Sequence, residues 1–175
     1  EFNIEGFPSP EFCDLVCEVV PTQVTLVPDE PGQITSNHGW DTRKHNAFLT
    51  DIISSFHEKG IRTSIFIGAE PVMAEYAART GTDRVELYTE PYAAAYATHR
   101  ETAILPFVET AQTCRDAGLG VNAGHDLSLE NLAYYHGQIP WTDEVSIGHA
   151  LICDALYLGL EETIRRYQNC LGNTI

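Results

Sequence analysis

Hydrophobic and polar positions along this chain alternate between short β-rich runs and longer stretches with helical spacing. The clearest helical stripe places apolar residues at 48, 49, 52, 53 and 56, on one side of a helix that Gly60 ends. Short runs rich in Val, Ile, Leu, Thr and aromatic residues predict strands instead. We predict strands at 2–6, 23–27, 63–67, 84–88, 120–122 and 145–147, and helices at 8–20, 48–56, 71–78, 104–114 and 150–169.

Two of these helices have a predicted inward face that the structure can test. The first should turn Phe12, Leu15 and Val19 toward the core. In the last helix the inward residues should be Leu156, Leu160, Ile164 and Tyr167.

The order of the elements gives about six strand-then-helix units, which predicts a parallel sheet with right-handed crossovers. Such a sheet is either doubly wound or three quarters of a (β/α)₈ barrel. The glycine fingerprint of a dinucleotide fold is absent, and polar residues follow successive strands, so we favour the barrel, an α/β TIM fold. We expect a single, incomplete barrel domain over 1–175, because the chain opens at Glu1 and already reads as a strand.

Histidines follow glycines at the ends of the last two predicted strands. His125 comes after Ala123-Gly124, where a turn would expose an imidazole that can act as acid or base near neutral pH. Gly148 and His149 begin the last helix, whose free N–H groups can bind a phosphate. The alternatives are a histidine bonded within its own loop and an ordinary tight turn.

Two glutamates and a polar loop complete the candidate chemistry. Glu5 ends the first strand and Glu86 lies within the fourth; inside a barrel mouth, apolar walls would raise their pKa values and suit them to proton transfer. Each could instead face solvent or an ion-pair partner. Thr35 and Ser36 lie in the long polar stretch 29–40, which is either a closing loop that binds an anion or an ordinary solvated loop.

Composition narrows the function further. The net charge of −15 argues against nucleic acid and anionic membranes as partners. No apolar run approaches the roughly 18 residues of a membrane span, and no signal peptide is visible. Cysteine and histidine spacing predicts no metal site, and the five cysteines read as reduced thiols of a cytoplasmic protein. The ten Lys and Arg residues fall on predicted helices or at strand starts, away from the rim.

Taken together, these motifs resemble the pyridoxine 5′-phosphate synthase family, the ring-closing enzymes of vitamin B6 biosynthesis. The resemblance covers essentially all 175 residues, and its most specific parts are the Asn-Ala-Gly-His and Ile-Gly-His-Ala motifs. The segments that carry it are Asn3-Ile4-Glu5, Leu26-Val27-Pro28, Gln33-Ile34-Thr35-Ser36, Val85-Glu86-Leu87-Tyr88-Thr89-Glu90-Pro91-Tyr92, Val121-Asn122-Ala123-Gly124-His125-Asp126-Leu127 and Ser146-Ile147-Gly148-His149-Ala150.

The resemblance implies strands three to eight of a (β/α)₈ barrel, with the first two βα units absent. It implies a transferase that condenses 1-deoxy-D-xylulose 5-phosphate with 3-amino-2-oxopropyl phosphate and releases phosphate and water. It also implies no cofactor and a cytoplasmic homo-oligomer, which is an octamer in the family.

Carried over by motif, three residues are expected to be catalytic. Glu5 resembles the general acid/base on strand three, Glu86 the group that stabilises a charged intermediate, and His125 the proton donor on strand seven. Binding roles fall to four more positions. Thr35 would contact the deoxyxylulose phosphate, while Asp126, Gly148 and His149 would lie at the aminooxopropyl phosphate.

The chain also departs from the family pattern. The family's N-terminal Asp-His, its arginine-bearing strand and its strand-two histidine have no counterpart. Gly68 stands in place of an expected aspartate, and Asp126 stands where some members have glycine, so only a backbone contact is inferred there. We therefore expect the chain alone to fold poorly or aggregate and to be inactive, and we assign the function to its full-length parent.

Two other functions are consistent with the residues alone. Another (β/α) barrel could isomerise or cleave a single sugar phosphate with the same two carboxylates and histidine. The chain could also be an inactive truncated fragment or a scaffold. Two anion sites would favour the synthase over the first of these.

Overall fold

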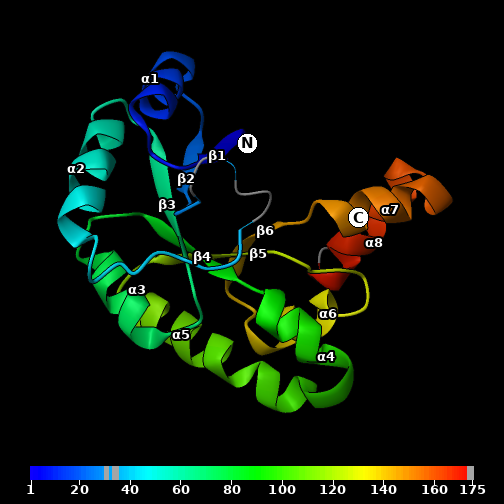
Figure 1. Ribbon diagram of the computed structural model, residues 1–175. Helices are drawn as coiled ribbons and strands as arrows, with labels where there is room; N and C mark the ends of the chain where they lie inside the picture. Colours follow the sequence, from blue (N-terminus) through cyan, green and yellow to red (C-terminus); the bar gives the residue numbers. More distant parts are fainter. Residues whose placement is uncertain (30–31, 33–35, 173–175) are drawn as a thin grey trace.

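Six parallel strands and eight helices alternate along the chain in the computed structural model, which describes residues 1–29, 32 and 36–172 (Figure 1). The elements are β1 (Asn3–Gly6), α1 (Pro10–Val19), β2 (Gln23–Leu26), α2 (Asn46–His57), β3 (Arg62–Ile67), α3 (Pro71–Ala78), β4 (Arg84–Tyr88), α4 (Glu90–Ala103), α5 (Leu105–Asp116), β5 (Gly120–Gly124), α6 (Leu132–Gln138), β6 (Thr142–Ser146), α7 (His149–Leu158) and α8 (Leu160–Cys170).

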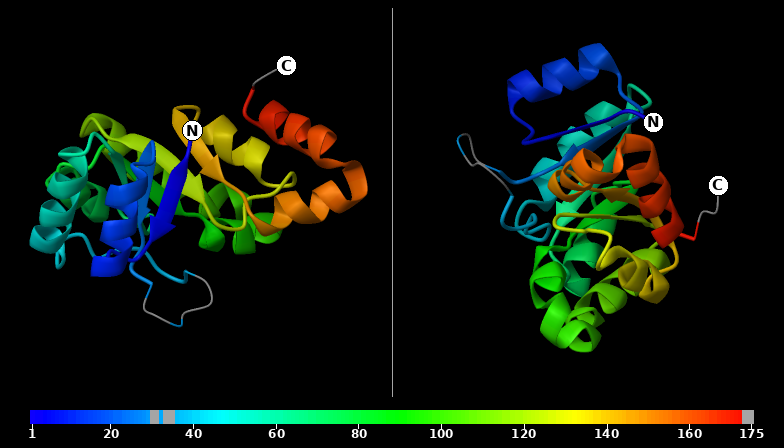
Figure 2. Two further views of the ribbon diagram at one scale, coloured as in Figure 1. Left: turned by 90° about the horizontal axis from the view of Figure 1, so that it is seen from above. Right: turned by 90° about the vertical axis from the view of Figure 1, so that its right-hand side faces the viewer.

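The strands form one sheet in sequence order, from β1 at one edge to β6 at the other, and every neighbouring pair is parallel. The sheet is curled, and the helices form an arc outside it that stays open between β1 and α7 (Figures 1 and 2). A doubly wound sheet would reverse its strand order and carry helices on both faces. The observed order and the curl therefore favour the barrel-like alternative predicted above.

Alternation along each strand separates an apolar outer face from a polar inner face, because successive side chains point to opposite sides. The outer residues pack against the helices in the main hydrophobic core; they include Leu26, Ile65, Val85, Leu87 and Val121. The intervening positions carry polar groups, among them Thr25, Ser64, Glu86, Asn122 and Glu144. The concave side of the sheet is therefore available for chemistry.

Glu144 on β6 links strands that are not neighbours in the sheet. Its carboxylate accepts a hydrogen bond of 3.1 Å from Gln23 Nε2 on β2 and pairs with Arg62 on β3 at 2.8 Å. It also pairs with Arg84 on β4 at 3.0 Å. These contacts cross the concave side at the amino-terminal end of the strands, and they are possible only because the sheet curls.

The predicted inward faces of the first and last helices were largely wrong. In α1 Phe12 is half-buried against the core as predicted, but the fully buried residue is Val16, whereas Leu15 is 50% exposed and Val19 is 43% exposed. The predicted closing helix is two helices, because Gly159 breaks it with φ 81° and ψ 149°. Tyr167 is buried as predicted, but Leu156 is 80% exposed. Leu160 and Ile164 are exposed as well.

Two helices were not predicted, α4 and α6, since neither has a long apolar stripe. α4 buries only Tyr92 among its residues, and α6 is a short helix of seven residues. The last strand begins at Thr142, earlier than the predicted Val145, and a register shift accompanies its pairing with β5. Among the residues that the structure describes, no helix has both the length and the apolar character needed to cross a membrane.

Candidate active site

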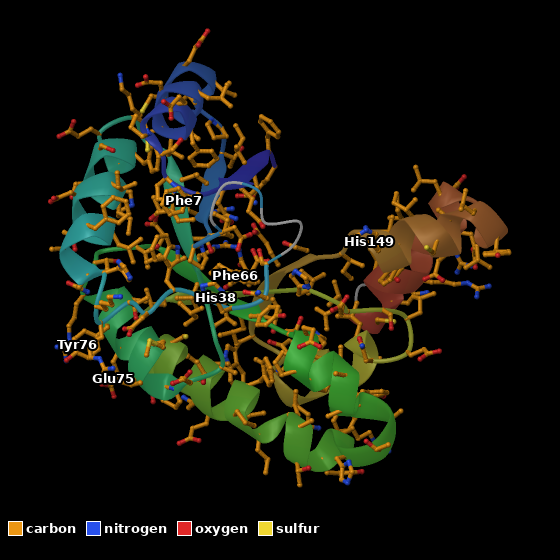
Figure 3. The ribbon with its side chains drawn as sticks, in the orientation of Figure 1. Phe7, His38, Phe66, Glu75, Tyr76 and His149 are labelled. Carbon is orange, nitrogen blue, oxygen red and sulfur yellow. The ribbon has the colours of Figure 1, made fainter. Side chains whose placement is uncertain are left out.

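A cavity of about 680 Å³ lies at the carboxyl ends of the strands and brings together residues from β1, β3, β4, the β5–α6 turn and the start of α7. Six of the seven predicted site residues line it: Glu5, Glu86, His125, Asp126, Gly148 and His149. The seventh, Thr35, lies outside the described residues. Phe66 lies near the middle of the curled sheet and His149 at the base of α7 (Figure 3). Both glutamates therefore line the cavity, whereas the sequence left open whether they face solvent.

Glu86 is the most deeply buried of these groups, with 3% of its surface exposed. Its Oε2 atom is buried and has no hydrogen-bond partner among the described residues. The pKa of Glu86 is raised to about 8, mainly by burial and also by the negative charge of Glu5, while a hydrogen bond with Ser146 opposes the shift. At neutral pH the carboxyl group is mostly protonated, so it can donate a proton or a hydrogen bond.

Gly124 on β5 pairs with Tyr88, two residues beyond Glu86, and leaves the space that the Glu86 carboxyl group occupies. A Cβ at Gly124 would overlap Oε1 of Glu86 and lie 3.2 Å from Cβ of Ser146. The glycine of the Asn-Ala-Gly-His motif therefore has a packing role that the sequence alone did not show.

Glu5 occupies the edge strand and retains solvent exposure, in contrast to Glu86. Surrounding protein atoms raise the pKa of Glu5 above its usual value, the charge of Asp29 raises it further, and His125 lowers it. The two carboxyl groups thus stand in different surroundings within one cavity. Different surroundings allow one carboxyl group to hold its proton while the other titrates.

His125 lies on a strained turn directly after β5. Its φ is 89° and that of Asp126 is 59°, values that residues other than glycine adopt at a cost of about 1–3 kcal/mol each. Nδ1 of His125 lies 3.5 Å from Oδ2 of Asp126. The imidazole packs edge-on against Tyr88, with ring centres 5.1 Å apart, and near Phe66 at 6.3 Å. The turn therefore places the imidazole at the cavity, with Tyr88 and Phe66 packed beside it.

The amino end of α7 faces the same cavity through Gly148, His149 and Ala150. Gly148 is the N-cap of this ten-residue helix, and no side chain caps it. A Cβ at Gly148 would meet no atom of the described residues within 4 Å. The first-turn N–H groups and the helix dipole are therefore placed to bind an anion.

The position of Arg43 differs from the prediction that every Lys and Arg lies away from the rim. Arg43 lies in the β2–α2 loop, at the carboxyl end of the sheet, where it lines a neighbouring cavity of about 780 Å³ with His38 and Tyr88. It was predicted to lie away from this rim. None of the described residues that line the cavity with Glu86 is Lys or Arg. No cluster of three or more His, Cys, Asp or Glu side chains suited to a metal ion is found among the described residues.

Sequence reasoning missed several residues of the site. Phe66, Tyr88 and Ser146 all contact the groups discussed above, but an aromatic or serine residue in a strand has no special spacing. Ser146 lies beside Gly124 in the sheet register, and that pairing was the only signal that could have found it.

The sequence is similar to known proteins along nearly its whole length. The family described as pyridoxal phosphate biosynthesis protein PdxJ matches residues 1–173. A pyridoxine 5′-phosphate synthase of Bacteroides thetaiotaomicron is 66% identical over 98% of this chain, which spans 72% of that relative. One from Phocaeicola vulgatus is 64% identical over the same shares of both chains.

Two solved structures with similar folds are much more distant in sequence. A mutant tryptophan synthase α-subunit from Pyrococcus furiosus has a TM-score of 0.63 at 16% identity, covering 98% of this chain and 66% of its own. The BexX/CysO complex of Amycolatopsis orientalis gives a TM-score of 0.59 at 15% identity, with 91% of this chain and 58% of that chain covered. At this identity the likeness shows the fold alone, which is TIM-barrel-like.

Proposed function

This chain belongs to the PdxJ family of pyridoxal phosphate biosynthesis proteins, and from that premise we propose that it acts as a pyridoxine 5′-phosphate synthase. The substrates would be 1-deoxy-D-xylulose 5-phosphate and 3-amino-2-oxopropyl phosphate, and phosphate and water would be released. The observation that carries the proposal is one cavity lined by Glu5, Glu86, His125 and the open amino end of α7.

Glu86 fits a role in both protonation states. Joining an amine to a ketone releases water and passes through a positively charged iminium. A carboxyl group that is mostly protonated at neutral pH can donate to a departing hydroxyl group. Positive charge on the bound intermediate would then favour its ionised form, because an opposite charge nearby stabilises the carboxylate.

Glu5 and His125 would share the remaining proton transfers. Forming a carbon–carbon bond beside a carbonyl group requires a base, and losing a second water requires an acid. Glu5 is solvent-accessible, so it can exchange protons with water between steps. His125 stands in the same cavity on a fixed turn, and an imidazole can donate or accept near neutral pH.

The two phosphate groups need separate places. The N–H groups of the α7 amino end would hold that of 3-amino-2-oxopropyl phosphate, with Asp126 nearby. Thr35, on the β2–α2 connection, is proposed to contact the deoxyxylulose phosphate. Two anion sites distinguish this function from that of a barrel enzyme that acts on a single sugar phosphate.

We further propose that β1 to β6 correspond to strands three to eight of an eight-stranded barrel. Support comes from the open edges of the sheet and from the 72% of the relatives' length that this chain spans. Two further βα units would pair with both edges and could bring cations to the phosphates. We also propose that the protein is a homo-oligomer and that it is located in the cytoplasm.

Turnover of the two phosphates together tests the function. The full-length protein should form pyridoxine 5′-phosphate, followed by its absorbance, only when both substrates are present. Conversion of the deoxyxylulose phosphate alone, with no pyridine product, would instead support the single-substrate alternative. Neither activity in a folded full-length protein would contradict the proposed function.

A further inference from the structure

We propose that Thr89 is a positioning residue, which holds the strained turn at His125 so that the imidazole keeps its place in the cavity. The inference rests on the proposed function, and it concerns a side chain that does not line the cavity. It begins from the hydrogen bonds of Thr89, which follows β4 and precedes α4.

Thr89 is fully buried and bonds two consecutive carbonyl groups of the neighbouring turn. Its backbone N–H donates to the carbonyl oxygen of Gly124 at 2.8 Å. Its hydroxyl group lies 2.7 Å from the same oxygen and 2.5 Å from the carbonyl oxygen of His125. A hydroxyl group has one proton to donate, so the two carbonyl groups share it.

The position of Thr89 makes this use of its hydroxyl group unusual. Thr89 is the N-cap of α4, where a threonine side chain ordinarily accepts a hydrogen bond from its own helix. Here the side chain makes no cap hydrogen bond. The hydroxyl group therefore bonds the turn after β5 and not the first turn of α4.

The same turn is held from its other side by Asn131. Nδ2 of Asn131 donates to the carbonyl oxygen of Asp126 at 3.1 Å, and its Oδ1 accepts from the N–H of Ser128 at 2.9 Å. Three consecutive carbonyl groups, from Gly124 to Asp126, are thus bonded by Thr89 or Asn131. Both left-handed residues lie inside this segment, and such a backbone persists only when its surroundings fix it.

The geometry predicts an effect on the chemical step more than on binding. Glu86, Tyr88 and Thr89 all come from the end of β4, so Thr89 ties the His125 turn to the strand that carries the buried carboxyl group. Loss of the tie would shift the imidazole relative to Glu86. The amino end of α7, whose N–H groups are proposed to bind phosphate, belongs to a different connection and would stay in place; of the proposed contacts to that phosphate, only Asp126 lies on the His125 turn.

The test compares two valine variants in the full-length protein. Thr82→Val is the matched control, since its buried hydroxyl group lies 3.1 Å from the carbonyl oxygens of both Thr63 and Arg84, before β4. We expect similar losses of thermal stability in both. Thr89→Val should lower kcat by about 10- to 100-fold with little change in KM, as expected for a misplaced catalytic group, and Thr89→Ser should restore it. Thr82→Val should leave kcat within about twofold of the parent.

A second pair keeps the inference testable if Thr89→Val does not fold. Asn131→Asp removes the donor to the carbonyl oxygen of Asp126 and keeps an acceptor for the N–H of Ser128. Its control is Asn46→Asp, because the amide of Asn46 donates to the carbonyl oxygen of Tyr76 at 2.9 Å. A kcat loss in Asn131→Asp alone would support positioning of the turn. Equal kcat values for variants and controls, with product still formed by the parent, would overturn the inference. Absence of product from the folded parent would instead contradict the proposed function.

Discussion

Glu86 and Glu5 show how one cavity can give two carboxyl groups different proton affinities. Glu86 is buried between strands, and one of its oxygens has no partner within the described part of the chain, whereas Glu5 stands on the open edge strand. The free-energy cost of burying a negative charge is larger for Glu86, and its pKa is therefore raised to about 8. Its proton therefore has a measurable effect on stability as well as a proposed role in catalysis.

Stability should fall with rising pH because of Glu86. The folded protein holds this proton up to about pH 8, while the unfolded chain releases it near the ordinary value of 4.5, so the folded state binds more protons between these values. The free energy of unfolding should decrease across that interval, by at most roughly 4–5 kcal/mol.

Urea unfolding at pH 5.5 and pH 8 checks this effect. Glu86→Gln should reduce the pH dependence, whereas Glu109→Gln, an exposed glutamate on α5, should leave it unchanged. Equal pH dependence in the parent and Glu86→Gln would show that Glu86 does not carry the effect.

Gly124→Ala should destabilise the protein through its contact with Glu86. The added methyl group would overlap Oε1, and overpacking of this kind costs about 1–3 kcal/mol. The cost should shrink in a Glu86→Ala background, which removes the obstructing group. Chemical unfolding of the four proteins of this cycle measures the coupling, and Gly137→Ala, with no atom within 4 Å, is the control. Additive losses in the cycle would contradict the packing explanation.

At the residue scale, the sequence predicted the groups with distinctive chemistry and missed those that support them. His125 and Gly148 were found because a glycine beside a histidine after a strand is a local pattern. Thr89 and Ser146 act through partners that are distant in sequence; the Thr89–Gly124 contact, for example, spans 35 residues. Only the register of β4, β5 and β6 brings these groups together.

Among the elements, the alternation of strands and helices was predictable because short β-rich runs differ in spacing from the longer stretches with helical periodicity. The face of each helix that turns inward could not be predicted in the same way, because it depends on which elements pack against the helix. α7 is strongly apolar yet contains no buried residue, and its Tyr157 is 90% exposed. The periodicity of its apolar residues was mistaken for a sign of burial.

Gly159 separates α7 from α8 and should not tolerate a side chain. Its φ of 81° with ψ of 149° is a backbone conformation that is essentially restricted to glycine. Gly159→Ala should therefore lose about 1–3 kcal/mol of stability, while Gly137→Ala within α6 should be neutral or slightly stabilising. Thermal unfolding of the two variants tests this, and an unchanged midpoint for Gly159→Ala would mean that α7 and α8 can join as one helix.

For the whole molecule, polar contacts cross the concave side of the curled sheet. Glu144 contacts both Arg62 and Arg84, and these bonds join β6 to β3 and β4. Glu144→Gln should cost about 1–3 kcal/mol, as for hydrogen bonds to charged groups.

Glu162 is a matched control for Glu144, because each side chain is 31% exposed and each pairs with two arginines. The pairs of Glu162 lie within one helix, so Glu162→Gln should cost about 0.5 kcal/mol or less. Chemical unfolding compares the two, and equal losses would show that contacts across the sheet add nothing beyond a local surface pair.

The central claim is that the cavity around Glu86 performs pyridoxine 5′-phosphate synthesis, and His125 provides its most direct test. Turnover of both phosphates by full-length His125→Asn should fall by about 100-fold or more if the imidazole transfers a proton. His99→Asn, which changes an exposed histidine on α4, should keep parental turnover. Product formation at the parental rate by His125→Asn would contradict the account.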